Sequence, residues 1–186
     1  MYWYKAKQLH GVMLTGILFL TICLISCKPA IKETGASLKY FDIKGYFEKD
    51  SARLTRAHKM VFKTVLHNGV SESKKMYIAN WGLELNFFKS SDINRPAWRD
   101  SYTIQADSNF LIYKAKDPDL KTREIVIKLD KGKVKWILIG NYTKNLLYTT
   151  REKLSYFPDS LYMVEKMQAV RVIGINRYWV KGAFIQ

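Results

Sequence analysis

The chain has 186 residues, with 31 Lys and Arg against 16 Asp and Glu, which gives a formal net charge of +15. This length fits one domain, or one domain with a tail. Hydrophobic residues (48%) and aromatic residues (14%) are too abundant for a disordered protein. Two cysteines exclude a disulfide-stapled miniprotein and a four-cysteine zinc site.

The N-terminal segment has the pattern of a processing signal. Lys5 and Lys7 supply a positive start, and the first acidic residue is Glu33. An apolar run over residues 12–25 follows, and it is shorter than the roughly 20 residues that cross a hydrocarbon core. It matches the apolar region of a secretory signal peptide, which has about 7–15 residues.

The apolar run ends in Leu24-Ile25-Ser26-Cys27. This resembles the lipobox of bacterial lipoproteins, in which an aliphatic residue at −3 and a small residue at −1 precede an invariant cysteine. The resemblance implies that Cys27 receives a diacylglyceryl group, that signal peptidase II cuts before it, and that its new amino group is acylated. Cys23 is a second candidate, but it lacks a small residue at −1. The alternative is an uncleaved signal anchor in which the cysteine is incidental.

Cleavage before Cys27 would remove residues 1–26 and leave a net charge of +13. The only remaining cysteine would carry lipid, which excludes disulfides, cysteine nucleophiles and thiolate metal ligands. By the sorting rules of enterobacteria-like lipoproteins, Lys28 favours the outer membrane, and we expect the domain to face the periplasm. The expected partners are the membrane, through acyl chains on Cys27, and either anionic lipid or an acidic envelope protein. Nucleic acid is not expected, because such a protein does not meet it routinely.

Three segments are predicted: the signal peptide over residues 1–26, the lipidated cysteine and a tether over 27–38, and a single α+β domain over 39–186. The first helix is expected from residue 40 to about 56 and the second over 79–90. Their apolar stripes are Tyr40, Ile43, Phe47 and Leu54 in the first, and Trp81, Leu85 and Phe88 in the second.

The rest of the domain has the pattern of antiparallel strands. Asn68-Gly69 lies between two runs rich in β-forming residues and predicts a hairpin over residues 59–78. From Ser101 onward, short runs recur between turn signals, as in a sheet or open barrel. The strands are expected at 102–106, 110–116, 124–129, 134–142, 146–154, 161–171 and 178–184. We therefore predict two N-terminal helices packed on a curved antiparallel sheet or half-barrel.

The most unusual loop is residues 92–100, which concentrates two arginines, a tryptophan and two aspartates. Arg95 or Arg99 is suited to hold a carboxylate or phosphate bidentately, with Trp98 as an apolar platform. The favoured alternative is structural: Trp98 fills the core and each arginine pairs with a neighbouring aspartate.

No catalytic residue, metal ligand or cofactor is predicted. His58 and His67 are the histidines that follow Cys27. The sequence contains no serine-nucleophile motif that either could activate, and their spacing is not that of zinc ligands. Asp117 and Asp119 flank a proline and are interpreted as a β-turn rather than a metal site.

These features favour a membrane-anchored envelope lipoprotein with a non-catalytic binding or scaffolding domain. The first alternative is a carrier of lipid or another hydrophobic ligand, since helices over a curved sheet are broadly similar to the half-barrel carriers of the lipoprotein localisation system. A continuous apolar cavity between sheet and helices would favour the carrier, whereas a filled core would count against it. An envelope hydrolase is the least favoured alternative.

Overall fold

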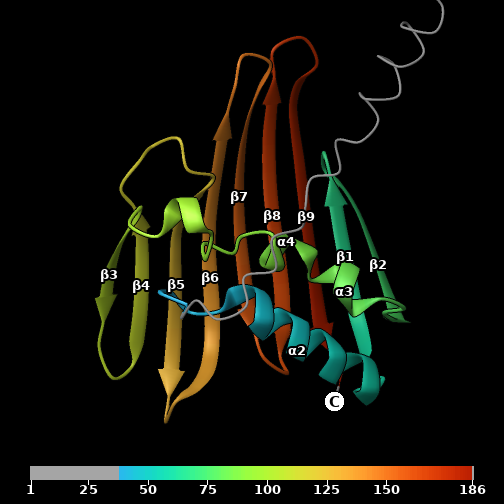
Figure 1. Cartoon of the computed structure of the whole chain (residues 1–186). Coiled ribbons are helices and arrows are strands. Elements are labelled where there is room, and N and C mark those ends of the chain that lie inside the picture. The colour runs from blue at the N-terminus through green and yellow to red at the C-terminus, as the bar shows by residue number, and fades with distance from the viewer. Residues whose placement is uncertain (1–37, 186) are drawn as a thin grey trace, which may run out of the picture. The chain divides into compact units, whose positions relative to one another are not determined.

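The computed structural model describes residues 38–185 of the chain (Figure 1). The predicted signal peptide, Cys27 and the tether up to residue 37 lie outside the described residues. The described residues form one compact unit that begins at Leu38. None of the helices in this unit has the length and apolar character needed to cross a membrane.

A single nine-stranded antiparallel sheet dominates the domain, with the strand order β2-β1-β9-β8-β7-β6-β5-β4-β3 (Figure 1). The strands are β1 (Met60–His67), β2 (Val70–Tyr77), β3 (Tyr102–Ala106), β4 (Phe110–Ala115), β5 (Thr122–Asp130), β6 (Lys133–Lys144), β7 (Tyr148–Phe157), β8 (Leu161–Val170) and β9 (Gly174–Phe184). Consecutive strands are neighbours except β2 and β3, which lie at opposite edges of the sheet. The last strand, β9, pairs with β1 and so joins the N-terminal hairpin to the rest of the sheet.

One long helix, α2 (Ile43–Ala57), precedes the sheet. Asp42 caps its first turn by accepting a hydrogen bond from the backbone amide of Gly45, at 2.8 Å. His58 ends the helix in the left-handed conformation, with a φ of 46°. The buried side chains of Ile43, Phe47 and Leu54 confirm three members of the expected apolar stripe. Tyr40, the fourth, is also buried, but it precedes the helix, which begins at Ile43 rather than at residue 40.

The second predicted helix is interrupted. The segment contains two one-turn helices, α3 (Trp81–Glu84) and α4 (Asn86–Lys89), because the backbone at Leu85 leaves helical geometry with a ψ of 13°. Trp81, Leu85 and Phe88 are nevertheless all buried, so the apolar spacing identified the correct side chains. A 3₁₀ turn, η2 (Pro96–Trp98), follows before the sheet continues.

The predicted α+β class with an antiparallel sheet is confirmed, and so is the first hairpin. Asn68 and Gly69 have φ values of 47° and 93°, as a type I′ turn requires. Strand β9 begins at Gly174, four residues before the expected strand. The early part of β9 carries a glycine and an asparagine, which weaken a strand signal, and its pairing with β8 supplies the missing stabilisation.

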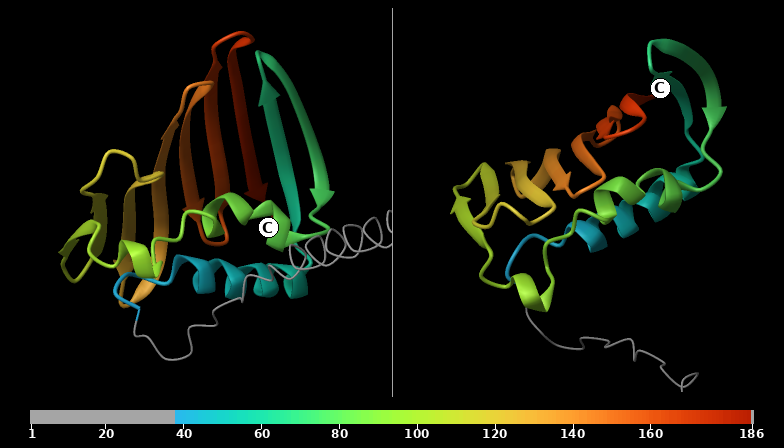
Figure 2. Two further views of the ribbon diagram at one scale, coloured as in Figure 1. Left: turned by 45° about the horizontal axis from the view of Figure 1, so that its top comes forward. Right: turned by 90° about the horizontal axis from the view of Figure 1, so that it is seen from above.

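The helices lie on one face of the curved sheet, which we call the inner face (Figure 2). Phe47 packs there against Phe88 and Tyr156, with ring centroids 4.8 and 5.0 Å apart. Trp81 packs against Phe184 at 5.6 Å. Aromatic rings therefore fill the space between the helices and the strands. The largest fully buried side chains include Trp81, Tyr156, Tyr162, Phe47, Phe88, Ile43, Leu54 and Leu85.

Gly182 on β9 is required for a close approach by an aromatic ring. A Cβ atom at this position would collide with the ring of Tyr162, whose hydroxyl donates a hydrogen bond to Glu84 at 2.6 Å. We expect Gly182→Ala to lower the free energy of unfolding by about 1–3 kcal/mol, the usual range for overpacking. Urea denaturation measures the loss. Gly140→Ala is the matched control, because a Cβ atom there meets nothing within 4 Å; equal losses in the two variants would contradict this account.

Candidate functional site

The face of the sheet opposite the helices, the outer face, carries the best-formed candidate site. Side chains alternate between the two faces along each strand, so pairing brings outward side chains from distant segments together. Leu66 of β1 lies opposite Trp179 of β9, and Trp179 lies opposite Glu165 of β8. Met167 of β8 lies opposite Arg177 of β9.

These side chains surround a shallow hollow of about 410 Å³, the outer groove. Its lining residues are Leu66, Arg151, Lys153, Glu165, Lys166, Met167, Arg177, Tyr178 and Trp179. The half-buried side chains of Leu66, Met167 and Trp179 supply an apolar floor. The charged residues beside them that are exposed are Arg151, Lys153, Glu165 and Arg177. The volume lies within the range of about 300–1,000 Å³ typical of ligand sites.

The charge of the outer groove is predominantly positive. Arg151, Lys153 and Arg177 are exposed, and Glu165 is the one acidic residue in the lining. Within residues 38–185, none of these three cations lies within 4 Å of a carboxylate. Arginine binds carboxylates through two parallel hydrogen bonds, and tryptophan offers a flat apolar surface. The arrangement suits an acidic group joined to an apolar one.

The loop predicted as a ligand site is only partly assembled. The guanidinium of Arg95 lies 4.4 Å from the centre of the Trp98 ring, and Trp98 packs against the buried core. Arg99 instead contributes its backbone carbonyl, which accepts a hydrogen bond from the Tyr40 hydroxyl at 2.6 Å. The structure therefore brings Arg95 and Trp98 together and leaves Arg99 apart from them, and a ligand role for the three residues stays a prediction.

The expected pairing of the two arginines with aspartates is not seen. Asp100 forms an ion pair with Lys39 at 2.6 Å, and this contact holds the pKa of the Asp100 carboxyl below its ordinary value. Asp92 accepts a hydrogen bond from Asn94, while burial raises the pKa of its carboxyl. The two aspartates of the loop therefore pair with Lys39 and Asn94 rather than with Arg95 or Arg99.

The remaining polar candidates occupy turns and helix ends. His67 is exposed at the end of β1, and His58 stacks on Tyr77 with ring centroids 4.4 Å apart. Asp117 accepts a hydrogen bond from the backbone amide of Asp119 at 2.8 Å, which is the geometry of the predicted turn. Each of these side chains has a structural contact or a solvated position.

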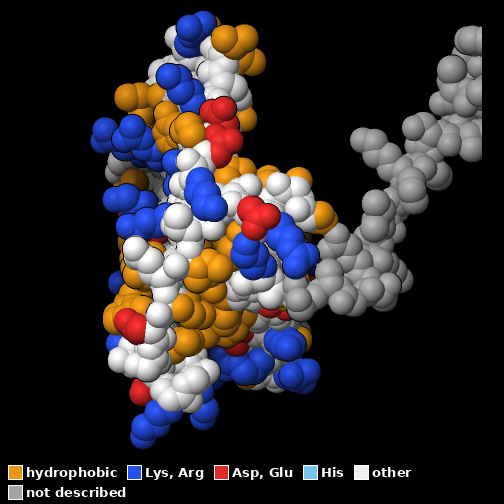
Figure 3. All heavy atoms as spheres, turned by 60° about the vertical axis from the view of Figure 1, so that its left-hand side comes forward, with side chains coloured by type: hydrophobic (Ala, Val, Ile, Leu, Met, Phe, Trp, Pro, Cys, Tyr) orange, Lys and Arg blue, Asp and Glu red, His pale blue; other side chains and the backbone are white. Residues whose placement is uncertain are grey.

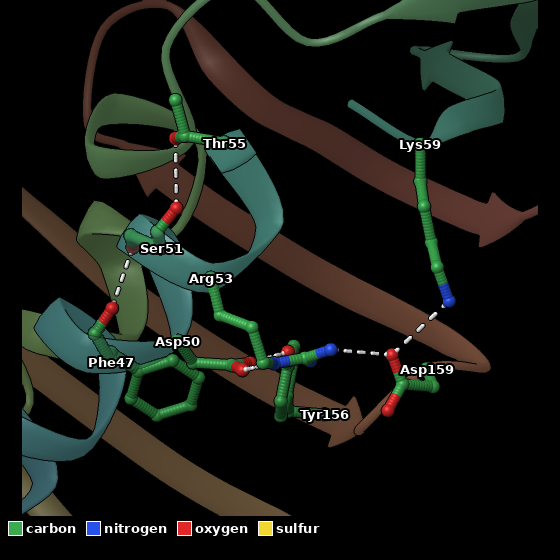
Figure 4. Close-up of polar contacts among 8 residues, drawn as sticks. All are labelled: Phe47, Asp50, Ser51, Arg53, Thr55, Lys59, Tyr156 and Asp159. Atoms are coloured by element: carbon green, nitrogen blue, oxygen red, sulfur yellow. Dashed lines mark hydrogen bonds and ion pairs between the residues drawn. The ribbon is translucent and has the colours of Figure 1, made fainter. Parts of the chain in front are cut away.

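A polar cluster joins α2 to the sheet (Figure 4), with Asp50 and Tyr156 buried, Arg53 half-buried and Asp159 exposed. The Tyr156 hydroxyl donates a hydrogen bond to Asp50, and Arg53 bridges Asp50 and Asp159 at 2.6 and 2.7 Å. Burial, and then the nearby charge of Asp50, raises the pKa of the Tyr156 hydroxyl. The Arg53 hydrogen bond lowers the pKa of the Asp159 carboxyl. A neutral tyrosine enclosed by protein has no access to a substrate, so the cluster fixes the helix on the sheet.

The outer groove was not predicted from the sequence, although one signal was present. The alternation of Met163, Glu165 and Met167 along β8 indicates a strand whose outward face mixes apolar and charged side chains. The pairing of β9 with β1 has no local signal, because its partners are separated by most of the domain.

Comparison of the chain with protein-family models, with curated proteins and with solved structures gave no match in any of the three. The comparisons therefore assign no family, and no relative supplies a function.

Proposed function

We propose that this chain is a bacterial envelope lipoprotein whose domain binds an acidic protein segment on the outer face of its sheet. Acyl chains on Cys27 hold it to the outer membrane, with the domain facing the periplasm. The observation that carries the binding proposal is the outer groove, in which three unpaired cations surround an apolar floor. The domain acts as a binding or scaffolding module.

The anchoring part of the proposal is supported by the order of features along residues 1–28. A positive start, an apolar run, a small residue before Cys27 and then Lys28 follow one another as in bacterial lipoproteins. Two acyl chains are needed for stable anchoring, because a single chain gives only reversible binding.

The open sheet face supports a macromolecular partner for the groove. Phe62 and Leu138 are exposed on the outer face, in addition to the apolar floor of the groove. Apolar side chains beside basic ones suit a partner with complementary acidic and apolar residues, and such charges also speed association. Figure 3 shows basic side chains gathered along the left-hand edge of the molecule in that view.

The packed inner face counts against a carrier with an internal ligand. A half-barrel carrier needs space between its helices and sheet, but Phe47, Trp81, Tyr156 and Tyr162 occupy that layer and are fully buried. We propose that the sheet is a half-barrel whose concave side is closed by the helices.

The groove is tested with full-length protein in lipid nanodiscs and a fluorescent peptide of alternating glutamate and leucine. We expect Arg151→Gln combined with Arg177→Gln to weaken binding by about tenfold or more, since a hydrogen bond to a charged group contributes about 1.5–3 kcal/mol. Fluorescence anisotropy measures the dissociation constant. Lys49→Gln combined with Lys133→Gln is the charge-matched control at exposed positions outside the groove. Equal affinities for both double variants, or equal binding of a lysine–leucine peptide, would contradict the proposal.

A further inference from the structure

Two turns at one end of the sheet expose aliphatic side chains. The β6–β7 turn carries Leu146 and Leu147, which are 81% and 70% exposed. The β8–β9 turn carries Val172 and Ile173, which are 94% and 77% exposed. None of these four residues belongs to the outer groove. Large aliphatic side chains that project so far from a domain mark a contact surface.

The two turns form one surface. The backbone amide of Arg171 donates a hydrogen bond to the carbonyl of Leu147 at 3.1 Å, and Tyr148 pairs with Val170 at the adjoining strand ends. The turns project at the top of the long strands in Figure 1. Hydrophobic and basic side chains lie next to one another at this end in Figure 3. We call Leu146, Leu147, Val172 and Ile173 the aliphatic tip.

The charge around the aliphatic tip has one sign. Residues 142–151 and 167–178, which include both turns and the adjoining strand ends, contain no Asp or Glu. They contain four cations, namely Lys144, Arg151, Arg171 and Arg177. All four are exposed. Aliphatic side chains at the end of a structure, with cations behind them and no acid, have the composition that binds at an anionic bilayer interface.

We infer that the aliphatic tip inserts into the surface of an anionic lipid bilayer and gives the domain a second membrane contact. The side chains of Leu146, Leu147, Val172 and Ile173 enter the boundary between headgroups and acyl chains. Lys144 and Arg171 meet the lipid phosphates. A protein partner would need a hollow to receive two separate turns, whereas a fluid bilayer accepts them without complementary shape.

The inference rests on the proposed function in one respect, since acylation of Cys27 would hold the domain beside a membrane.

Site-specific photocrosslinking of the full-length chain in vesicles tests the inference. Benzoylphenylalanine replaces Ile173 in one variant and Leu83 of α3 in the control, since these two side chains are 77% and 72% exposed. The vesicles contain phosphatidylcholine alone or phosphatidylcholine with phosphatidylglycerol, and flotation reports how much chain is bound. We expect several-fold more lipid adduct from position 173 than from position 83 in the anionic vesicles.

Removing positive charge beside the aliphatic tip is expected to reduce the yield of lipid adduct. Each basic residue near an anionic membrane strengthens binding about fivefold, so Lys144→Gln with Arg171→Gln is expected to lower the yield at position 173 several-fold. Lys49→Gln with Lys133→Gln is the charge-matched control and should leave the yield unchanged. Neither Lys144 nor Arg171 lines the outer groove, so this double variant distinguishes lipid contact at the tip from peptide binding in the groove.

The inference would be overturned by equal lipid adducts at positions 173 and 83, by adducts at 173 that are insensitive to phosphatidylglycerol, or by crosslinks from 173 to a second copy of the chain. A chain that floats but gives no adduct at 173 would also overturn it. A Cys27→Ser chain that still gives the adduct at 173 would support the inference, because the tip then contacts lipid independently of the anchor.

Discussion

Phe47→Ala is expected to lower the free energy of unfolding by about 3–5 kcal/mol, the range for removing a buried phenylalanine. The Phe47 ring is fully buried between Phe88 and Tyr156, with ring centroids 4.8 and 5.0 Å away. Its removal leaves a cavity between α2 and the sheet and also removes aromatic contacts. Urea denaturation at neutral pH measures the loss.

Phe62→Ala on the outer face is the control for Phe47→Ala. The Phe62 side chain is 43% exposed, so its removal creates no closed cavity, and we expect a loss of about 1 kcal/mol or less. A loss from Phe47→Ala as small as that from Phe62→Ala would show a loosely filled layer. That result would contradict the packed inner face and revive the carrier with an internal ligand.

Alkaline pH is expected to destabilise the domain steeply through two buried tyrosines. Burial is the main cause that raises the pKa of the Tyr156 and Tyr162 hydroxyls; Asp50 adds to it for Tyr156 and Glu84 for Tyr162. Both tyrosines ionise near pH 10 once unfolded, so the unfolded chain loses protons that the folded chain keeps. Their stabilising contribution is complete below pH 10 and is lost as the pH rises toward the folded-state pKa values. The loss is about 1.4 kcal/mol per pH unit for each tyrosine.

Tyr156→Phe separates this effect from general alkaline denaturation. The variant should lose stability above pH 10 by about 1.4 kcal/mol per pH unit less than the parent, because one buried hydroxyl is gone. Urea denaturation at several pH values gives the slope, and absorbance at 295 nm shows whether tyrosines ionise together with unfolding. Tyr77→Phe, at a position that is 49% exposed, is the control for removing one tyrosine hydroxyl. A slope for Tyr156→Phe equal to the parent's would contradict a buried, protonated Tyr156.

Local patterns were sufficient to predict much of the fold. The stripe of Ile43, Phe47 and Leu54 predicted α2, and Asn68-Gly69 predicted the first hairpin, because helix periodicity and turn geometry depend on neighbouring residues. The break at Leu85 was not predicted, since three well-spaced apolar residues fit one helix or two single turns equally well.

The candidate site depends on pairing that no local pattern encodes. Leu66 and Trp179 are neighbours only because β9 adds to β1, and a one-residue shift in register would turn each side chain to the other face. The loop over residues 92–100 was predicted as a candidate site because it is rich in functional residue types. The contact that Arg99 makes there is through its backbone carbonyl, which accepts a hydrogen bond from Tyr40. The charge distribution was similarly hidden, because the turns beside Lys144 and Arg171 come to the same end of the sheet only through the pairing of β7 with β8.

The intact mass of the protein isolated from a bacterial host shows whether Cys27 carries the membrane anchor. We predict a chain that begins at Cys27 and carries a diacylglyceryl group and an amide-linked acyl chain. Cys27→Ser should abolish both processing and palmitate labelling, and Cys23→Ser should preserve both. A parent chain that retains residues 1–26, or a Cys27→Ser variant labelled with palmitate as strongly as the parent, would contradict a lipid anchor at Cys27.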